Sequence, residues 1–291
     1  MRILITGANG QLGQEFSRLP YNAREETIFW TRQDVDICDH QLEQKIKAVH
    51  PTHLINCAAY TAVDLAESQP ERAFMVNADA VANLAEVCTK LNIPMIHFSS
   101  DYVYHNHLRR PLEESDPTRP KGVYAKSKLK GEQFFMGRHP YPLIFRVSWL
   151  YSTFGNNFPK TILGLASKRE QLNVVKDQVG APTYAKDVAE MVIRIIRNQR
   201  STQDWKKISG IYNYSNEGLT NWYEMASFIV RFSQLNCQIN PIPSRDFPTA
   251  ASRPRYSKLN LSKFRVTFGN EIRDWQDAME ECLMNLQTKD C

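Results

Sequence analysis

The first thirteen residues, MRILITGANGQLG (1–13), combine a short apolar run with three closely spaced glycines. Residues 3–5 are apolar without interruption, which is typical of a strand that is buried on both faces of a sheet. The glycines that follow are Gly7, Gly10 and Gly13, with the spacing G-x-x-G-x-x-G. Because a helical pattern follows them to about residue 19, this stretch predicts a strand, a phosphate-binding turn and a helix.

Each glycine suits a different requirement of that turn. Gly7 permits the tight reversal, Gly10 lets a pyrophosphate approach the backbone, and Gly13 lets the helix pack closely on the sheet. The helix N-terminus, which includes Gln11 and Leu12, adds a partial positive charge. We therefore expect these five residues to bind a dinucleotide, and the alternative is a turn with a purely structural role.

The rest of the first half repeats the alternation of strand and helix. Apolar strand-like runs lie at residues 27–30, 53–57, 95–99 and 143–147, with helical patterns between them. Strands that are apolar throughout and separated by helices predict an α/β fold with a doubly wound, Rossmann-like parallel sheet.

The second half is less regular, and it predicts a smaller substrate lobe that is interleaved with the first domain. The expected dinucleotide-binding domain comprises residues 1–150, with segments near 173–198 and 210–215 that return to it. The substrate lobe is expected to comprise residues 151–172 and 216–291. Within it, residues 240–254 are rich in proline and arginine and are expected to form loops.

Composition restricts the class of protein. The 291 residues are 42% hydrophobic and 23% charged, which predicts a large core and argues against global disorder. A net charge of +5 is too weak and too scattered to indicate a nucleic-acid partner. Because residues 1–4 lead directly into a strand, we expect no signal peptide, and no apolar run approaches the ~20 residues of a membrane helix. Six cysteines without C-x-x-C or zinc-ligand spacing suggest a reducing compartment, so we expect a cytoplasmic protein without a membrane partner.

The end of the second strand indicates which dinucleotide is bound. Enzymes specific for NAD often place a carboxylate there, but this chain has Arg32. Asp36 and Ile37 follow shortly after, and we expect them to contact the cofactor as well. A guanidinium suits a 2′-phosphate, so the sequence favours NADPH over NADH. The alternative is that Arg32 is a solvated surface residue.

A second constellation predicts the chemistry. Tyr124 and Lys128 are four residues apart on an expected helix and therefore share one face. A nearby ammonium is expected to lower the pKa of the phenol, which could then give a proton to an alkoxide formed by hydride transfer. Ser100 follows a strand at the edge where open α/β sheets bind ligands, and its hydroxyl could hydrogen bond to the substrate carbonyl.

These features resemble the extended short-chain dehydrogenase/reductase superfamily and, within it, the dTDP-4-dehydrorhamnose reductase family. The resemblance covers residues 1 to about 275. It is carried by residues 56–64 (NCAAYTAVD), 99–104 (SSDYVY), 146–151 (RVSWLY), 155–158 (GNNF) and 177–184 (DQVGAPTY). The last of these runs is specific to this family, whereas the glycine turn and Y-x-x-x-K are shared by the whole superfamily.

The resemblance implies a reaction and a set of roles. Hydride from NADPH or NADH reduces C4 of dTDP-4-dehydro-L-rhamnose, and Tyr124 protonates the oxygen. Lys128 tunes Tyr124 and holds the nicotinamide ribose, and both residues contact the cofactor. Ser100 stands where the family usually has threonine. The remaining implied residues are Ala58, Ala59 and Tyr60 along the cofactor, Asp101 and Tyr102 in the sugar pocket, Trp149 as a platform for the sugar, and Arg253 at the diphosphate.

Several of these roles have plainer alternatives. Trp149 could fill the core between the lobes, Arg253 could be a loop charge, and Asn77 is expected to be a satisfied buried amide rather than a catalytic group. Some relatives bind magnesium through glutamates at a dimer interface. Glu15 and Glu190 occupy plausible positions without a third ligand, so a homodimer and a possible Mg²⁺ site stay open.

Residues 105–107 (HNH) depart from the family, which often has an aspartate–glycine turn at this place. The two histidines lack a third ligand at metal spacing and are expected to be loop residues.

Two other functions are compatible with the sequence. One is a related reductase or epimerase that acts on another nucleotide sugar. The other is a non-catalytic regulatory subunit that binds a dinucleotide. The presence of Ser100, Tyr124 and Lys128 together favours an enzyme.

Overall fold

The computed structural model describes residues 1–105, 108–269 and 272–287. Asn106, His107 and Cys291, which enter the sequence-based expectations above, lie outside the described residues.

A six-stranded parallel sheet forms the centre of the larger part of the molecule. Its strands are β1 (Arg2–Thr6), β2 (Glu26–Trp30), β3 (His53–Asn56), β4 (Met95–Ser100), β5 (Leu143–Val147) and β10 (Gly210–Tyr214). They lie in the order β10-β5-β4-β3-β1-β2, with all neighbours parallel. The chain order reverses between β1 and β3, which is where doubly wound sheets bind nucleotides. The predicted Rossmann-like fold is confirmed.

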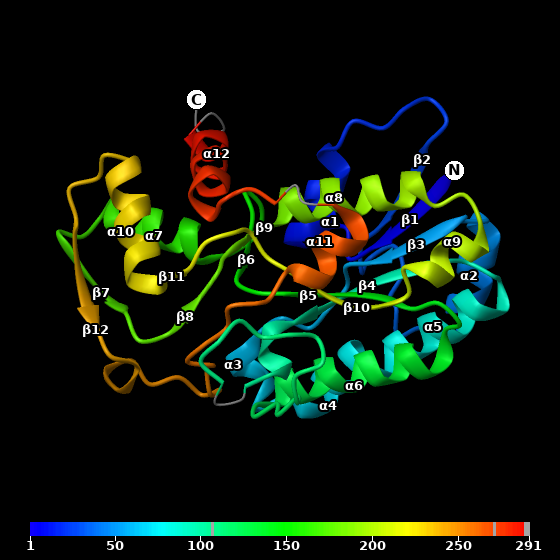
Figure 1. Cartoon of the computed structure of the whole chain (residues 1–291), viewed down its shortest axis with the longest axis horizontal. Helices are drawn as coiled ribbons and strands as arrows, with labels where there is room; N and C mark the ends of the chain where they lie inside the picture. The colour runs from blue at the N-terminus through cyan, green and yellow to red at the C-terminus, as the bar shows by residue number, and fades with distance from the viewer. Residues whose placement is uncertain (106–107, 270–271, 288–291) are drawn as a thin grey trace.

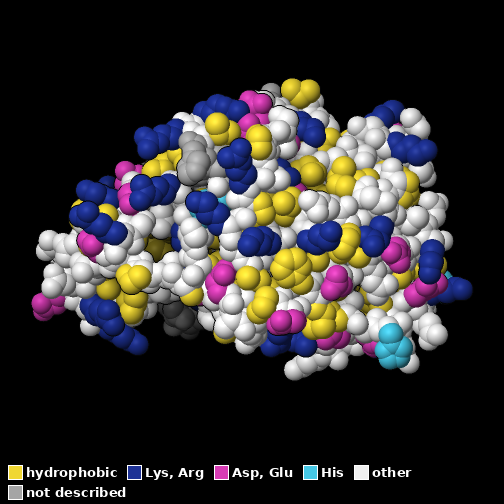
Figure 2. Space-filling view, turned by 90° about the horizontal axis from the view of Figure 1, so that it is seen from below, with side chains coloured by type: hydrophobic (Ala, Val, Ile, Leu, Met, Phe, Trp, Pro, Cys, Tyr) yellow, Lys and Arg dark blue, Asp and Glu magenta, His cyan; other side chains and the backbone are white. Residues whose placement is uncertain are grey.

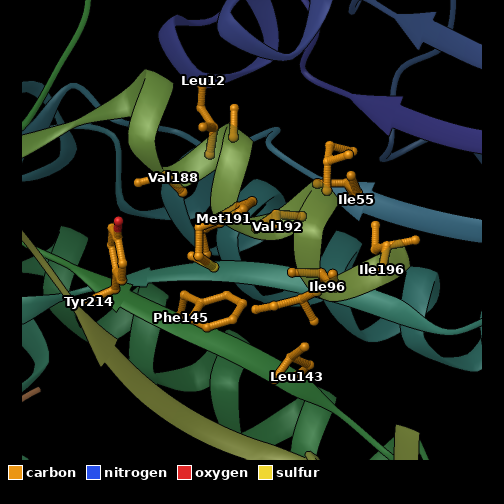
Figure 3. Close-up of a cluster of buried hydrophobic side chains, with 14 of the residues drawn as sticks. Leu12, Ile55, Ile96, Leu143, Phe145, Val188, Met191, Val192, Ile196 and Tyr214 are labelled. Carbon is orange, nitrogen blue, oxygen red and sulfur yellow. The ribbon is translucent and has the colours of Figure 1, made fainter. Parts of the chain in front are cut away.

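Helices cover both faces of this sheet (Figure 1). One layer comprises α1 (Gln11–Arg18), α8 (Ala185–Asn198), α9 (Thr202–Lys207) and α11 (Ser262–Phe268). The other comprises α2 (Leu42–Val49), α4 (Pro70–Phe74), α5 (Ala80–Lys90) and α6 (Val123–Arg138), and the short α3 (Val63–Ala66) lies beside it. Figure 3 shows how Val188, Met191 and Val192 of α8 pack toward Ile96 and Phe145 of the strands. The apolar strands are thus buried because both layers contribute apolar side chains to them.

The smaller lobe has its own apolar core and lies at the left of Figure 1. Its elements are α7 (Phe158–Ala166), β7 (Gln171–Val175), β8 (Val179–Gly180), β11 (Thr220–Asn221), α10 (Trp222–Phe232), β12 (Gln238–Ile242) and α12 (Trp275–Gln287). The short parallel pair β6 (Leu150–Tyr151) and β9 (Thr183–Tyr184) lies where the two lobes meet.

The structure differs from the sequence-based expectations in the second half. Residues 173–175 belong to β7, which pairs with β12 in the smaller lobe rather than returning to the large sheet. The stretch 240–254 was expected to be all loop, but it begins inside β12. Pro241 is tolerated there because β12 pairs on one side only, so its missing N–H removes no ladder bond from a central strand. In the other direction, α11 packs on the large sheet through Phe264 although residues 216–291 were assigned to the substrate lobe.

The long helix that begins at Pro70 contains an irregularity. A π-helical turn, η1 (Met75–Asp79), separates α4 from α5. Such turns insert one extra residue into a helix and frequently occur at functional sites.

The surface supports no large basic patch on the face seen in Figure 2. Lysine and arginine side chains are spread over that face, with acidic side chains between them. Within the described parts of the chain, no helix combines the length and apolarity needed to cross a bilayer.

Candidate active site

The glycine turn is pressed against the loop that follows β3. Gly7 has φ +68°, and a Cβ at this position would lie 2.5 Å from the backbone nitrogen of Ala58. A Cβ on Gly13 would lie 2.4 Å from the carbonyl oxygen of Gly7. A side chain at Gly10 would meet only the carbonyl oxygen of Gly7, at 3.2 Å, so this position faces open space. The tight turn at Gly7 and the close packing at Gly13 agree with the sequence-based expectation, and a side chain at Gly10 would occupy the space where we expect the pyrophosphate.

The loop after β3 is fixed to the end of β1. The side-chain oxygen Oδ1 of Asn56 accepts hydrogen bonds from the Thr6 hydroxyl at 2.7 Å and from the amide of Ala58 at 3.1 Å. Asn77 in the π-helical turn holds the next part of the loop, because its Oδ1 accepts from the amide of Tyr60 at 2.9 Å and its Nδ2 donates to the Tyr60 carbonyl at 3.0 Å. Asn77 is therefore the satisfied buried amide that the sequence predicted.

A cavity of about 350 Å³ lies between this loop, the glycine turn and the end of β2. Eight residues predicted to bind the cofactor line it: Gly7, Gly10, Arg32, Asp36, Ile37, Ala58, Ala59 and Tyr60. Seven further residues line it: Cys57, Thr61 and Ala62 belong to the run 56–64 that carries the family resemblance, and Asn9, Val35, Arg72 and Val76 were not predicted. Most of these are sequence neighbours of predicted residues, whereas Arg72 and Val76 come from the helix that begins at Pro70 and carry no sequence signal.

The charges in the cavity are exposed to water. Arg32 pairs with Asp36 at 3.1 Å, and 61% and 38% of the two side chains are exposed. Arg72 lies over the ring of Tyr60, with its guanidinium carbon 5.9 Å from the ring centre. The backbone amide of Cys38 is the main cause that lowers the pKa of Asp36, so this carboxyl is ionised near neutral pH.

Gln11 and Leu12 do not line this cavity. The side chain of Gln11 accepts a hydrogen bond from Nδ2 of Asn157 at 2.9 Å, and Leu12 is buried in the core of the large sheet. Their backbone groups at the start of α1 are the ones we expect to bind a phosphate.

The predicted reaction centre assembles at the end of β4. The hydroxyl of Ser100 donates to Oδ1 of Asp101 at 3.0 Å and accepts from the amide of Tyr102 at 3.2 Å. The rings of Tyr102 and Tyr124 meet edge to face, with their centres 5.7 Å apart. Lys128, one turn further along α6, is buried and donates to the carbonyl of Phe98 in β4 at 2.5 Å.

The pKa of Tyr124 differs from our expectation. Burial raises it to about 12, the Asp101 carboxylate adds to the rise, and a hydrogen bond with the Ser100 hydroxyl opposes it. Lys128 was expected to lower this pKa, but its ammonium contacts the Phe98 carbonyl instead. Burial lowers the pKa of Lys128 to about 8, against the attraction of Glu132. Tyr124 is therefore a protonated phenol near neutral pH, in the correct state to donate a proton.

Asp101 is the third perturbed group at this centre. Burial raises its pKa to about 6, although hydrogen bonds from the Ser257 and Ser100 hydroxyls oppose the rise. Its Oδ2 has no hydrogen-bond partner among the described residues. A buried acceptor in this state suits a hydroxyl group of a ligand.

Helix α6 is held in position from two sides. A Cβ on Gly131 would lie 2.1 Å from the carbonyl oxygen of Asn77, so α6 touches the π-helical turn directly. Nδ2 of Asn77 also donates to the Ser127 hydroxyl at 3.0 Å. At the N-terminus of α6, the Glu67 carboxylate accepts from the amide of Val123 at 2.8 Å. These contacts fix the helix that carries Tyr124 and Lys128.

The remaining predicted substrate residues lie between the lobes. Trp149 has a left-handed backbone, φ +49°, and stacks on Trp222 of α10 with ring centres 3.9 Å apart. Arg253 pairs with Asp64 of α3 at 2.6 Å. Trp222 and Asp64 could not be predicted as partners, because each lies far from its partner along the chain.

Glu15 and Glu190, for which a metal role stayed open, both have partners within the chain. Glu15 accepts from the Ser152 hydroxyl at 2.5 Å, and Glu190 lies 3.7 Å from the ammonium of Lys186. Residues 1–105, 108–269 and 272–287 contain no group of three or more His, Cys, Asp or Glu side chains placed to bind a metal. A larger cavity of about 650 Å³ lies away from the glycine turn, and its Asp187 and Glu281 pair with Arg273. None of the residues predicted to bind the cofactor or the substrate lines this cavity, so we place the active site at the sheet edge.

Known proteins resemble the chain over its whole length. A family model described as RmlD substrate binding domain matches residues 1–288. The dTDP-4-dehydrorhamnose reductase of Aggregatibacter actinomycetemcomitans is 37% identical over 289 residues, which cover 96% of this chain and 97% of that protein.

Solved structures agree with this likeness. A crystal structure of a dTDP-4-dehydrorhamnose reductase from Clostridium acetobutylicum has a TM-score of 0.93 and 35% identity, with 99% of this chain and 100% of that one covered. A dTDP-4-dehydrorhamnose reductase from Bacillus anthracis, in complex with NADP, has a TM-score of 0.92 and 32% identity, with 98% and 99% covered. The likeness therefore includes both lobes.

Proposed function

This chain belongs to the RmlD substrate binding domain family of dTDP-4-dehydrorhamnose reductases, and from that premise we propose how its residues carry out the reaction. The chain is an NAD(P)-dependent oxidoreductase that reduces the C4 keto group of dTDP-4-dehydro-L-rhamnose. The observation that carries this function is the buried Tyr124 hydroxyl beside Ser100, in a chain that matches reductases over its whole length.

The residues present fit a nicotinamide dinucleotide. The cradle at Gly10 is open where a side chain would block it, and the adjoining cavity offers Arg32 and Arg72 to phosphate groups. Gly7, Gly10, Gln11, Leu12 and Gly13 would hold the pyrophosphate through backbone groups, and Asp36, Ile37, Ala58, Ala59 and Tyr60 would contact the rest of the cofactor. When bound, the reduced nicotinamide supplies the hydride.

The protein supplies the proton. We assign proton donation to the Tyr124 hydroxyl, because burial keeps it protonated and the Ser100 hydroxyl lies beside it. The Ser100 hydroxyl is assigned to the substrate carbonyl oxygen, where negative charge develops. Lys128 is assigned to the nicotinamide ribose, because its ammonium is buried in the same site and anchored to β4.

The substrate residues follow from their positions. We propose that the larger sheet binds the cofactor and that the smaller lobe closes over the nucleotide sugar. Asp101 offers its unpartnered Oδ2 to a sugar hydroxyl, and Tyr102 lies beside it. Trp149 is the platform for the sugar, and Arg253 binds the diphosphate.

Three finer points are also proposals. NADPH is preferred over NADH because Arg32 stands at the end of β2, and the NADP complex of the Bacillus anthracis relative supports this. The reducing environment suggested by five free cysteines in the described residues supports a cytoplasmic location. A homodimer and a Mg²⁺ site at its interface stay predictions.

The test is a reaction with a defined product. The protein is incubated with NADPH and dTDP-4-dehydro-L-rhamnose, loss of nicotinamide absorbance is followed, and the product is identified by NMR. We expect dTDP-L-rhamnose. The C4 epimer would instead show a related sugar reductase, and the absence of any NADPH oxidation would favour a regulatory subunit.

A further inference from the structure

We propose that Asp64 is a positioning residue that makes binding of the substrate's nucleotide diphosphate depend on the bound cofactor. The inference rests on the function proposed above, in which Arg253 binds that diphosphate. It concerns the segment of residues 247–255, here called the strap, which joins the smaller lobe to α3 of the larger one.

The strap reaches α3 across the space between the lobes. It follows a single short turn, η3 (Ser244–Asp246), and in Figure 1 the orange chain runs from β12 toward α3. Both carboxylate oxygens of Asp64 hold it. Oδ1 accepts from the amide of Ala251 at 2.9 Å, and Oδ2 accepts from Nη2 of Arg253 at 2.6 Å.

The other end of this connection is the cofactor cavity. The cavity is lined by the loop 57–62, and Asp64 follows only two residues later. α3 has four residues, so it has little rigidity of its own and its position depends on its neighbours. Glu67 at its end contacts the first residue of α6, next to Tyr124. Cofactor contacts would add to the bonds that Asn56 and Asn77 already make to this loop, and would thereby restrict α3 and the strap further.

Arg253 is suitably placed for the substrate. Its charge opposes the rise that burial causes in the pKa of Tyr102, a residue of the reaction centre. A guanidinium has five N–H donors. One terminal nitrogen donates to Asp64, and the other makes only a long contact of 3.4 Å with the Ala251 carbonyl. Donors are thus left for a diphosphate while Asp64 keeps the group oriented.

This arrangement predicts positive coupling between the two ligands. When cofactor contacts restrict loop 57–62 further, the diphosphate bears less of the entropic cost of ordering the strap. Coupling of this kind commonly changes affinity by about 5- to 150-fold. We expect dTDP to bind the complex with NADP⁺ about tenfold more tightly than it binds the free protein.

The test is calorimetric titration of dTDP into the protein without and with saturating NADP⁺, which involves no turnover. In the Asp64→Asn variant the amide oxygen can still accept from Ala251, but the ion pair with Arg253 is lost. We expect the ratio of the two affinities to fall from about ten to near one. Asp64 is 46% exposed, so the variant should keep its fold, which circular dichroism checks.

Two further variants sharpen the result. Arg253→Gln removes the same ion pair by changing its other member. It should weaken dTDP binding both with and without NADP⁺, and should bring the ratio of the two affinities to near one. Glu86→Gln is the matched control, because Glu86 forms a similarly exposed ion pair with Arg138 at 2.7 Å, away from the cofactor cavity. It should leave the ratio unchanged.

The outcomes separate the two levels of the proposal. If dTDP fails to bind the parent in either state, the nucleotide-sugar function is wrong. If dTDP binds the parent equally well with and without NADP⁺, the function stands and the role of Asp64 is rejected. The role is also rejected if Asp64→Asn keeps the full tenfold difference between the two affinities.

Discussion

The reaction centre and the cofactor cavity lie at the same edge of one sheet, but their ionisable groups differ in solvent exposure. At the reaction centre, burial raises the pKa of Tyr124 to about 12 and lowers that of Lys128 to about 8. In the cavity, Arg32 stays largely in water and pairs with Asp36, which is partly exposed. Desolvation changes what a group can do chemically, whereas a solvated pair chiefly supplies binding. Substitutions at the first region should therefore have much larger effects than substitutions at the second.

The largest effect is expected for Tyr124→Phe. Without the phenolic hydroxyl no protein group donates the proton directly, so kcat should fall by about 10²- to 10⁴-fold. Cofactor affinity, measured by quenching of protein fluorescence, should stay close to that of the parent. Tyr141→Phe is the control, because this buried hydroxyl bonds to Asn92 at 2.9 Å. Equal kcat values for Tyr124→Phe and the parent would remove Tyr124 from the mechanism.

Asp101→Asn should change stability in a pH-dependent manner. The folded state raises the pKa of Asp101 to about 6, so the favourable contribution is complete below the unfolded pKa and is lost as the pH rises through about 6. Ionised Asp101 should thus cost about 3 kcal/mol at about pH 8. Urea unfolding at about pH 5 and about pH 8 gives the free energy of unfolding of the parent and of Asp101→Asn. The fall in this free energy between the two pH values that is due to Asp101 should be absent in the variant.

Asp116→Asn should change the pH dependence of stability in the opposite direction. Burial favours protonation of Asp116, but hydrogen bonds from Arg110 and the Glu113 amide outweigh it and lower the pKa. Its contribution is present above the unfolded pKa and is lost as the pH falls, so this variant should lose stability at the higher pH. The same pH response in both variants would contradict the role of burial at Asp101.

Lys128→Arg tests whether activity needs the positive charge of Lys128. If its charge is needed, kcat/KM of the parent should fall above about pH 8, by about tenfold for each further pH unit. Arginine keeps its charge throughout this range, so the variant should be less active but should lack that decline. A pH profile with the same decline in the variant would assign it to another group.

The smallest effect is expected for Arg32→Ala. Because Arg32 is solvated and already paired with Asp36, its loss should lower the preference for NADPH over NADH by about fivefold. The measurement is the ratio of kcat/KM for the two cofactors. Arg24→Ala is a control, because its side chain does not line the cavity. An equal loss with NADH would show that Arg32 does not recognise the 2′-phosphate.

The parts of the structure that the sequence could predict depend on local patterns. Apolar strands and the glycine spacing predicted the sheet, and Y-x-x-x-K placed Tyr124 and Lys128 on one face of α6. The pair of β7 and β12 was missed because Pro241 argues against a strand unless the strand is known to lie at an edge.

Contacts between distant residues could not be predicted at all. Asp64 and Arg253 are 189 residues apart, and nothing in either segment indicates the other. The direction of the Tyr124 pKa was missed for a related reason. Spacing along a helix predicts a neighbouring charge, but burial depends on everything that packs around the phenol.

The two glycines in the second half of α6 have opposite prospects under random mutagenesis. Gly137 has nothing within 4 Å of a new Cβ, so most replacements there should be silent. Gly131 meets the carbonyl of the widened turn at Asn77, so even a methyl group would act as a wedge between the two helices. Such a wedge would tilt the proton donor without touching any ligand. A library screened for activity should therefore yield many active variants substituted at position 137 and almost none substituted at position 131.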